Sequence, residues 1–67
     1  MSWDKIEGKW RYLIGKVKEQ WGKFNDNDCE RIAGKREKLI GDIQKKYGIS
    51  KEEAEKQVGD WKRNPNV

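Results

Sequence analysis

The chain has 67 residues, of which 42% are charged and 33% apolar, and its net charge at neutral pH is +4. A chain of this length supports one domain with a small core, because such chains bury only about 60% of the surface that their unfolded state exposes. No apolar run approaches the roughly 20 residues of a membrane-spanning helix, and the first residues lack the pattern of a signal peptide. We therefore expect a single cytoplasmic domain over residues 1–67 with no membrane insertion.

Apolar residues recur every three or four positions along the chain, which is the spacing of an amphipathic helix. In the first half this stripe consists of Trp3, Ile6, Trp10, Leu13, Val17, Trp21 and Phe24. In the second half it consists of Cys29, Ile32, Leu39, Ile43, Tyr47, Ala54, Val58 and Trp61, with Arg36 in the place that Trp10 holds earlier. The pattern predicts an all-α fold with these side chains in its core.

Capping residues mark where the helices begin. Ser50 and Glu53 form the pattern of a capping box, in which the serine hydroxyl accepts a hydrogen bond from the backbone N–H of the glutamate. Asn25 and Asp28 occupy the equivalent positions one unit earlier. Near the end of the chain, Pro65 limits the last helix to about residue 63.

Seven glycines divide the chain in a regular way. Residues 8–22 and 34–48 align with a shift of 26 and share the pattern Gly-Lys-x-x-x-Leu-Ile-Gly, followed by Val or Ile and then by Trp-Gly or Tyr-Gly. This pattern predicts an internal duplication with repeat units of about 2–22, 25–48 and 50–63. The fold we expect is a small bundle of helical hairpins in which short and long helices alternate.

Each glycine position has an expected role. Gly22 and Gly48 follow an aromatic residue at the end of each long stripe, where a left-handed residue ends a helix. Gly8, Gly34 and Gly59 are expected at bends that divide each unit into a short arm and a longer helix.

Two further glycines, Gly15 and Gly41, fall in the middle of a stripe, where glycine costs about 1 kcal/mol relative to alanine. The interpretation we favour is a pseudo-symmetric crossing, in which the missing Cβ lets two helices approach closely. The alternative is that both glycines merely loosen a solvated helix face.

Charge alternates along the chain, since residues 26–33 and 50–60 are acidic overall and residues 9–23 and 35–48 are basic. This alternation favours acidic arms packed against basic long helices within one molecule. Lysine and arginine beside aromatic residues in Lys9-Trp10-Arg11-Tyr12 are suited to phosphate contacts and base stacking. Because Trp10 belongs to the apolar stripe, we expect weak, salt-sensitive adhesion to polyanions rather than a specific nucleic-acid site.

Residues suited to catalysis are scarce. Histidine is absent, which removes the commonest general base and the commonest metal ligand. Cys29, the one cysteine, lies at a core position and is interpreted as a structural thiol in a reducing compartment. Asp26 and Asp28 have the spacing that opens a calcium loop, but Arg31 stands where that loop needs glycine. We therefore expect no enzyme, with no catalytic, cofactor-binding or metal-binding residues.

Several motifs recur in an order that resembles one known family. They are Gly15-Lys16-Val17-Lys18-Glu19-Gln20-Trp21-Gly22-Lys23, Asp26-Asn27-Asp28, Gly34-Lys35-Arg36, Leu39-Ile40-Gly41, Tyr47-Gly48, Glu53-Ala54-Glu55-Lys56 and Asp60-Trp61. Over nearly its whole length the chain resembles the CsbD-like family of small bacterial proteins. The resemblance implies a bacterial, cytoplasmic protein associated with general stress responses and built from helical hairpins. It implies no enzyme, cofactor or catalytic residue.

Two classes of function follow from these observations. The first, which the stripe and the repeated caps favour, is a folded interaction module that is a monomer or a weak homo-oligomer and binds a protein or an anionic surface. The second is a hydrophilic protectant that is partly disordered in isolation, which the composition favours. A weak binder of polyanions or nucleic acid is a further alternative. If Trp3 or Trp61 proved exposed among apolar neighbours, that patch would be the leading contact site.

Overall fold

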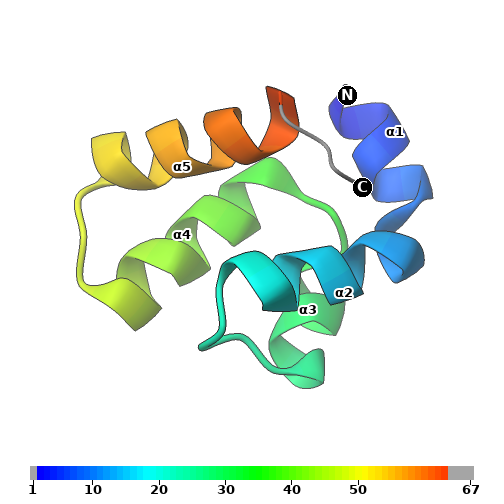
Figure 1. The fold of residues 1–67 in the computed structure, drawn as a ribbon, viewed down its shortest axis with the longest axis horizontal. Helices are drawn as coiled ribbons and strands as arrows, with labels where there is room; N and C mark the ends of the chain where they lie inside the picture. The colour runs from blue at the N-terminus through cyan, green and yellow to red at the C-terminus, as the bar shows by residue number, and fades with distance from the viewer. Residues whose placement is uncertain (1, 64–67) are drawn as a thin grey trace.

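A computed structural model describes residues 2–63 and shows five α-helices and no strand within them. The helices are α1 (Trp3–Gly8), α2 (Trp10–Gln20), α3 (Asp26–Ile32), α4 (Arg36–Tyr47) and α5 (Lys51–Arg63) (Figure 1). The predicted all-α fold is therefore confirmed. Short and long helices alternate through the first four, since α1 and α3 have 6 and 7 residues whereas α2 and α4 have 11 and 12. None of these helices is long and apolar enough to cross a membrane.

The helices pack around one core. α4 and α5 run antiparallel side by side and form a helical hairpin, while α3 packs against α4 and α2 packs against α3 (Figure 1). α1 joins α2 through a bend at Lys9 and lies near the end of α5, where the Lys62 ammonium sits 5.6 Å from the centre of the Trp3 ring. The two ends of the described chain thus meet on one side of the bundle.

Capping explains where the helices begin. The Ser50 hydroxyl accepts a hydrogen bond from the Glu53 N–H at 3.1 Å, as predicted. Asn25 and Asp28 form a complete capping box, because each side chain accepts a hydrogen bond from the other residue's backbone N–H. Pro65, which was expected to limit the last helix, lies outside the described residues.

Glycine ends only some of the helices at which it was expected. Gly48 caps α4 in the left-handed conformation, with φ at 62°. The prediction for Gly22 is wrong, because α2 ends at Gln20 and the chain leaves it through Trp21, whose φ is −124°. That conformation leads the indole of Trp21 into the core.

The bends at Gly8 and Gly34 are present, since Gly8 is the last residue of α1 and Gly34, with φ at 77°, follows α3. The bend expected at Gly59 is wrong, because α5 continues through it without interruption. Val58 and Trp61 are buried on either side of this glycine. Their packing holds the helix together across a residue of low helix propensity.

The close helix crossing predicted at Gly15 and Gly41 is also wrong. A Cβ built at either position would meet no atom of another element within 4 Å. The close approach is instead at Gly34, where a Cβ would lie 2.7 Å from the Cα of Glu7 in α1. Lys35, the next residue, forms an ion pair with the same glutamate.

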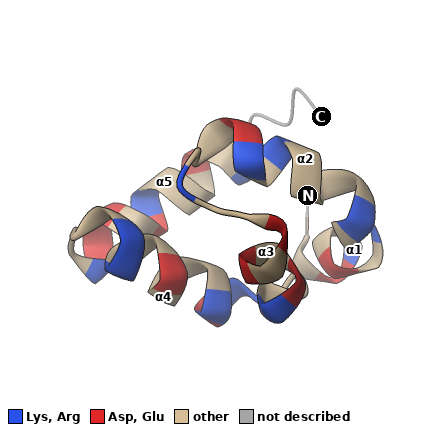
Figure 2. Ribbon diagram, turned by 90° about the horizontal axis from the view of Figure 1, so that it is seen from below, with Lys and Arg blue, Asp and Glu red and all other residues tan. Residues whose placement is uncertain are grey.

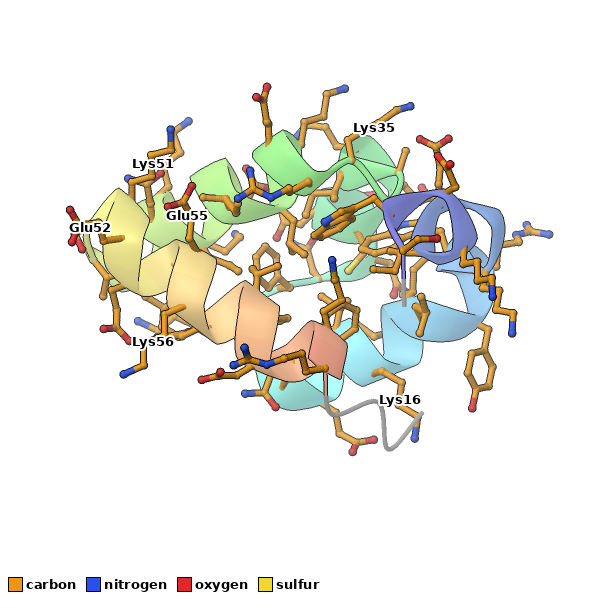
Figure 3. All side chains as sticks on the ribbon, turned by 90° about the horizontal axis from the view of Figure 1, so that it is seen from above. Lys16, Lys35, Lys51, Glu52, Glu55 and Lys56 are labelled. Carbon is orange, nitrogen blue, oxygen red and sulfur yellow. The ribbon has the colours of Figure 1, made fainter. Side chains whose placement is uncertain are left out.

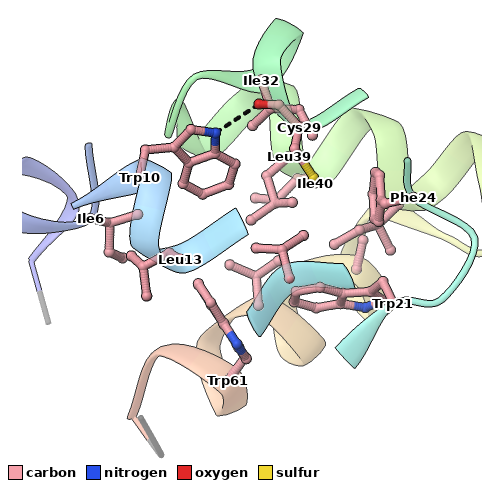
Figure 4. Close-up of a cluster of buried hydrophobic side chains, with 14 residues drawn as sticks. Ile6, Trp10, Leu13, Trp21, Phe24, Cys29, Ile32, Leu39, Ile40 and Trp61 are labelled. Carbon is pink, nitrogen blue, oxygen red and sulfur yellow. Dashed lines mark hydrogen bonds between the residues drawn. The ribbon is translucent and has the colours of Figure 1, made fainter. Parts of the chain in front are cut away.

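Most of the predicted stripe forms the core. The buried apolar residues are Ile6, Trp10, Leu13, Val17, Trp21, Phe24, Cys29, Ile32, Leu39, Ile40, Ile43, Ala54, Val58 and Trp61 (Figure 4). The Trp21 ring packs 5.7 Å from that of Trp61 and edge-on to Phe24. No side-chain nitrogen or oxygen buried among the described residues lacks a hydrogen-bond partner. The core is therefore apolar, and the polar side-chain atoms buried with it are hydrogen-bonded.

The two long helices lie at matching places in the aligned segments. The 26-residue shift carries α2 onto residues 36–46, which lie within α4. The short helices match less well, since α3 begins at Asp26 whereas the same shift carries the start of α1 to residue 29. The duplication and its unit bounds remain predictions from the sequence.

Candidate interaction surfaces

Acidic arms pair with basic helices across the fold. Lys18 of α2 lies 2.6 Å from a carboxylate oxygen of Asp26 in α3, and Arg36 of α4 lies 3.3 Å from one of Glu55 in α5. Figure 2 shows acidic residues on α3, beside the basic residues of its neighbours. The expected packing of opposite charges within one molecule is therefore present. Lys18 and Arg36 are each paired with a carboxylate.

Asp28 is the centre of the strongest polar cluster and is only 7% exposed. Its carboxylate lies 2.8 Å from the Lys46 ammonium, accepts the Asn25 N–H at 3.1 Å, and accepts a hydrogen bond from Arg31 at 3.0 Å. Arg31 also donates to Asp42 of α4 at 2.8 Å. The Lys46 ammonium, the Asn25 N–H and the Arg31 guanidinium together lower the pKa of Asp28 to about 2.

This cluster joins α3 to α4 and starts a helix. Asp26 and Asp28, whose spacing resembles the start of a calcium loop, have their carboxylates bonded to Lys18, Lys46 and Arg31. Within residues 2–63 no three histidine, cysteine or acidic side chains are grouped as metal ligands would be. The arrangement serves helix capping and packing.

The Cys29 thiol is fully buried in the core. Burial raises its pKa, because the thiolate would lose its hydration there. The backbone carbonyl of Cys29 accepts a hydrogen bond of 2.7 Å from the indole N–H of Trp10 (Figure 4). Both residues thus have structural positions, in agreement with the interpretation from the sequence.

One large hydrophobic side chain in the described part of the chain is strongly exposed. Tyr12, on the outer face of α2, is 61% exposed. Lys9 stands three residues before it and Lys16 four residues after it, so that all three share one helix face. Gly15 is another neighbour at this spacing within α2, and a Cβ there would meet nothing within 4 Å.

We call Lys9, Arg11, Tyr12 and Lys16 the α2 outer face. None of its three cations forms an ion pair with the described residues, in contrast to Lys18 on the same helix. Lys16 projects away from the bundle (Figure 3). The α2 outer face therefore combines uncompensated positive charge with an exposed aromatic ring.

A second surface feature lies on the outer side of α4. It is a hollow of about 550 Å³ lined by Arg31, Lys38, Gly41, Asp42, Gln44 and Lys45. Arg31 and Asp42 are engaged with each other, whereas Lys38 and Lys45 form no ion pair within the described part of the chain. Gly41 contributes no side chain to fill the space. The hollow is therefore weakly basic and has no exposed aromatic ring.

The tryptophan patch considered from the sequence is not formed. Trp61 is 9% exposed and packs in the core, and Trp3 is partly buried against it. The exposed aromatic residue is Tyr12, which lies off the apolar stripe between Trp10 and Leu13. Its place off the stripe is the signal that would have identified it.

Comparisons with known proteins place the chain in a family. The model of the CsbD-like family matches residues 4–56. The chain is 52% identical over 61 residues to the UPF0337 protein YjbJ of Escherichia coli K12, covering 91% of this chain and 88% of that protein. It is 48% identical over 66 residues to the UPF0337 protein YjbJ of Salmonella typhimurium, covering 98% and 94%. No solved structure matches it. The chain belongs to the CsbD-like family.

Proposed function

We propose that this chain is a non-enzymatic interaction module of the bacterial cytoplasm that acts during stress and binds an anionic partner through the α2 outer face. One observation carries the proposal: Tyr12 is exposed among three cations that have no acidic partner among residues 2–63, whereas the other large apolar side chains of this range lie in or against the core. The module acts as a monomer or a weak homo-oligomer.

The residues with reactive side chains support a role without catalysis. The Cys29 thiol is buried and its pKa is raised, so that little nucleophilic thiolate is present at neutral pH. Asp28 is bonded to two cations and has a lowered pKa, which makes it a poor general base. Histidine is absent from the sequence. These groups stabilise the fold.

The alternative is a hydrophilic protectant that orders only partly in isolation. Its support is the composition, with 42% charged residues and a mean hydropathy of −1.28. Against it stands a core of fourteen apolar residues, in which even the indole N–H groups of Trp10 and Trp21 find acceptors. A protectant that works by solvation has no need of such a core.

A thermal melt followed by far-UV and near-UV circular dichroism separates the two functions. The module predicts coincident, cooperative transitions with both probes. Heparin in low salt should raise the melting temperature, and high salt should abolish the increase. Near-UV signals that are absent at every temperature would establish the protectant instead. Unchanged melting with heparin would reject the anionic surface while leaving the folded module intact.

Alanine substitutions locate the surface. Lys9→Ala and Lys16→Ala together should remove most of the heparin shift, because they delete two of the three unpaired cations of the α2 outer face. Lys56→Ala is the matched control, since Lys56 projects from α5 among acidic residues (Figure 3). If both variants lost the shift equally, the effect would reflect net charge and not this surface.

A further inference from the structure

We infer that the α2 outer face binds single-stranded nucleic acid, with an unpaired base stacked on the Tyr12 ring and the strand's phosphates on Lys9, Arg11 and Lys16. The inference rests on the anionic surface proposed above and names its ligand. It is carried by the exposure of Tyr12 and by the three neighbouring cations, which form no ion pair with the described residues.

The ring has open neighbours. In a helix the side chains that cover a residue come from positions three and four residues away. Gly15, three residues after Tyr12 in α2, has no side chain that could cover the ring. A Cβ at Gly15 would meet nothing within 4 Å, so no other element lies close to this glycine. A planar base has room to lie against the phenol ring.

The charges suit a nucleic-acid backbone that passes over this ring. Lys9 and Lys16 lie seven residues apart, which is about 10 Å along a helix at 1.5 Å per residue. Lys9, at the start of α2, and Lys16, within it, stand on opposite sides of Tyr12 along the helix, where they can reach the phosphates that flank a stacked base. Glu19, three residues beyond Lys16, ends this positive stretch. The site is therefore short and holds few nucleotides.

Other anionic partners fit this surface less well. A protein interface needs a buried apolar centre, and Tyr12 is the one strongly exposed large hydrophobic among residues 2–63. A membrane surface binds the apolar face of an amphipathic helix, but in α2 that face, with Leu13 and Val17, lies in the core. Duplex DNA keeps its bases paired and offers no free base face. An unpaired strand uses both the ring and the cations.

Fluorescence anisotropy tests the inference with three probes: labelled oligothymidylate of about 20 nucleotides, a duplex of equal length, and heparin. The oligothymidylate should bind more tightly than the duplex. With three phosphate contacts, the logarithm of its affinity should fall by about 2 for each tenfold rise in salt. Comparable affinity for the single strand and the duplex would overturn the stacking model.

Substitutions at Tyr12 separate stacking from charge. Tyr12→Ala should weaken oligothymidylate binding about tenfold, whereas Tyr12→Phe, which keeps the ring, should bind as the parent does. Heparin binding should be the same in all three proteins. Because Tyr12 is exposed, both variants should keep the melting temperature of the parent, which a melt checks before any binding is compared.

The outcomes distinguish the two levels of the argument. If Tyr12→Ala leaves oligothymidylate binding unchanged while Lys9→Ala and Lys16→Ala weaken it, the stacking inference is wrong and the anionic surface stands. If the parent protein binds none of the three probes, both the inference and the anionic surface are wrong. The inference is supported if Tyr12→Ala binds oligothymidylate more weakly than the parent while Tyr12→Phe and Lys56→Ala bind it as the parent does.

Discussion

Glycine occupies two contrasting kinds of place in this molecule. Gly34 is buried, has a φ of 77°, and lies so close to α1 that a Cβ would be 2.7 Å from the Cα of Glu7. Gly15 and Gly41 lie within the long helices, with no other element within 4 Å of where a Cβ would stand. The first position needs glycine for the chain to pack. The other two leave the helix surface without a side chain. Substitution by alanine should therefore destabilise the protein at Gly34 and stabilise it at Gly15 and Gly41.

The largest effect is expected for Gly34→Ala. The added Cβ would overlap the backbone of Glu7, which has no flexible side-chain end that can move aside. Together with the positive φ, this should cost about 3 kcal/mol of unfolding free energy, measured by urea denaturation. Gly48→Ala is the control, because Gly48 also has a positive φ, 62°, but nothing within 4 Å of an added Cβ, and it should lose only about 1–2 kcal/mol. Equal losses of unfolding free energy in both variants would mean that the positive φ, and not the contact with Glu7, causes the destabilisation.

The junction between α3 and α4 should also weaken in acid. The folded-state pKa of Asp28 is about 2, below the ordinary value of 3.8, so the stabilisation is complete above about pH 4 and is lost as the pH falls toward 2. Asp28→Asn should lower the melting temperature at pH 7. It should also reduce the loss of stability between about pH 4 and pH 2. A variant with the acid sensitivity of the parent would exclude Asp28 as its source.

Gly41→Ala and Gly15→Ala should each stabilise the protein. Alanine is favoured over glycine in a helix interior by about 1 kcal/mol, and no neighbouring element opposes it at either position. For a domain of this size the melting temperature should rise by about 4–8 °C. Destabilisation at either position would restore the close helix crossing first predicted from the sequence.

The smallest gain is expected for Gly59→Ala. Gly59 is a helical residue of α5 with open space beside it, but it lies in the last part of the described helix. Helix ends fray, so the gain should be about half of that at Gly41. A thermal melt of the two single variants and of the double variant tests both the order and the additivity.

The pattern of the sequence was sufficient for the helices and most of the core. Periodic apolar residues identified the buried side chains, and local capping chemistry located the starts of α3 and α5, since both depend on neighbours in the sequence. The glycines were harder to interpret. The approach of Gly34 to Glu7 joins residues that are far apart in the sequence, and no local spacing reports such a contact.

The candidate site, too, could be predicted from the sequence only in part. The sequence places Lys9, Arg11 and Tyr12 together, but Trp10, a residue of the apolar stripe, lies among them and argues against a specific nucleic-acid site. The helix separates these neighbours, turning Trp10 inward to 7% exposure and Tyr12 outward to 61%. Which lysines remain unpaired depends on the arrangement of the helices, because Lys18 finds Asp26 only when α3 folds back against α2.

Because the Cys29 thiol is fully buried, the rate of its chemical modification reports how often the folded protein opens. A thiol reagent cannot reach a side chain that is fully enclosed, so modification proceeds only through molecules that have transiently opened. The labelling rate, divided by that of an unstructured cysteine peptide, then gives the open fraction without denaturant. Because the sequence contains one cysteine, the signal arises from a single place at the centre of the bundle.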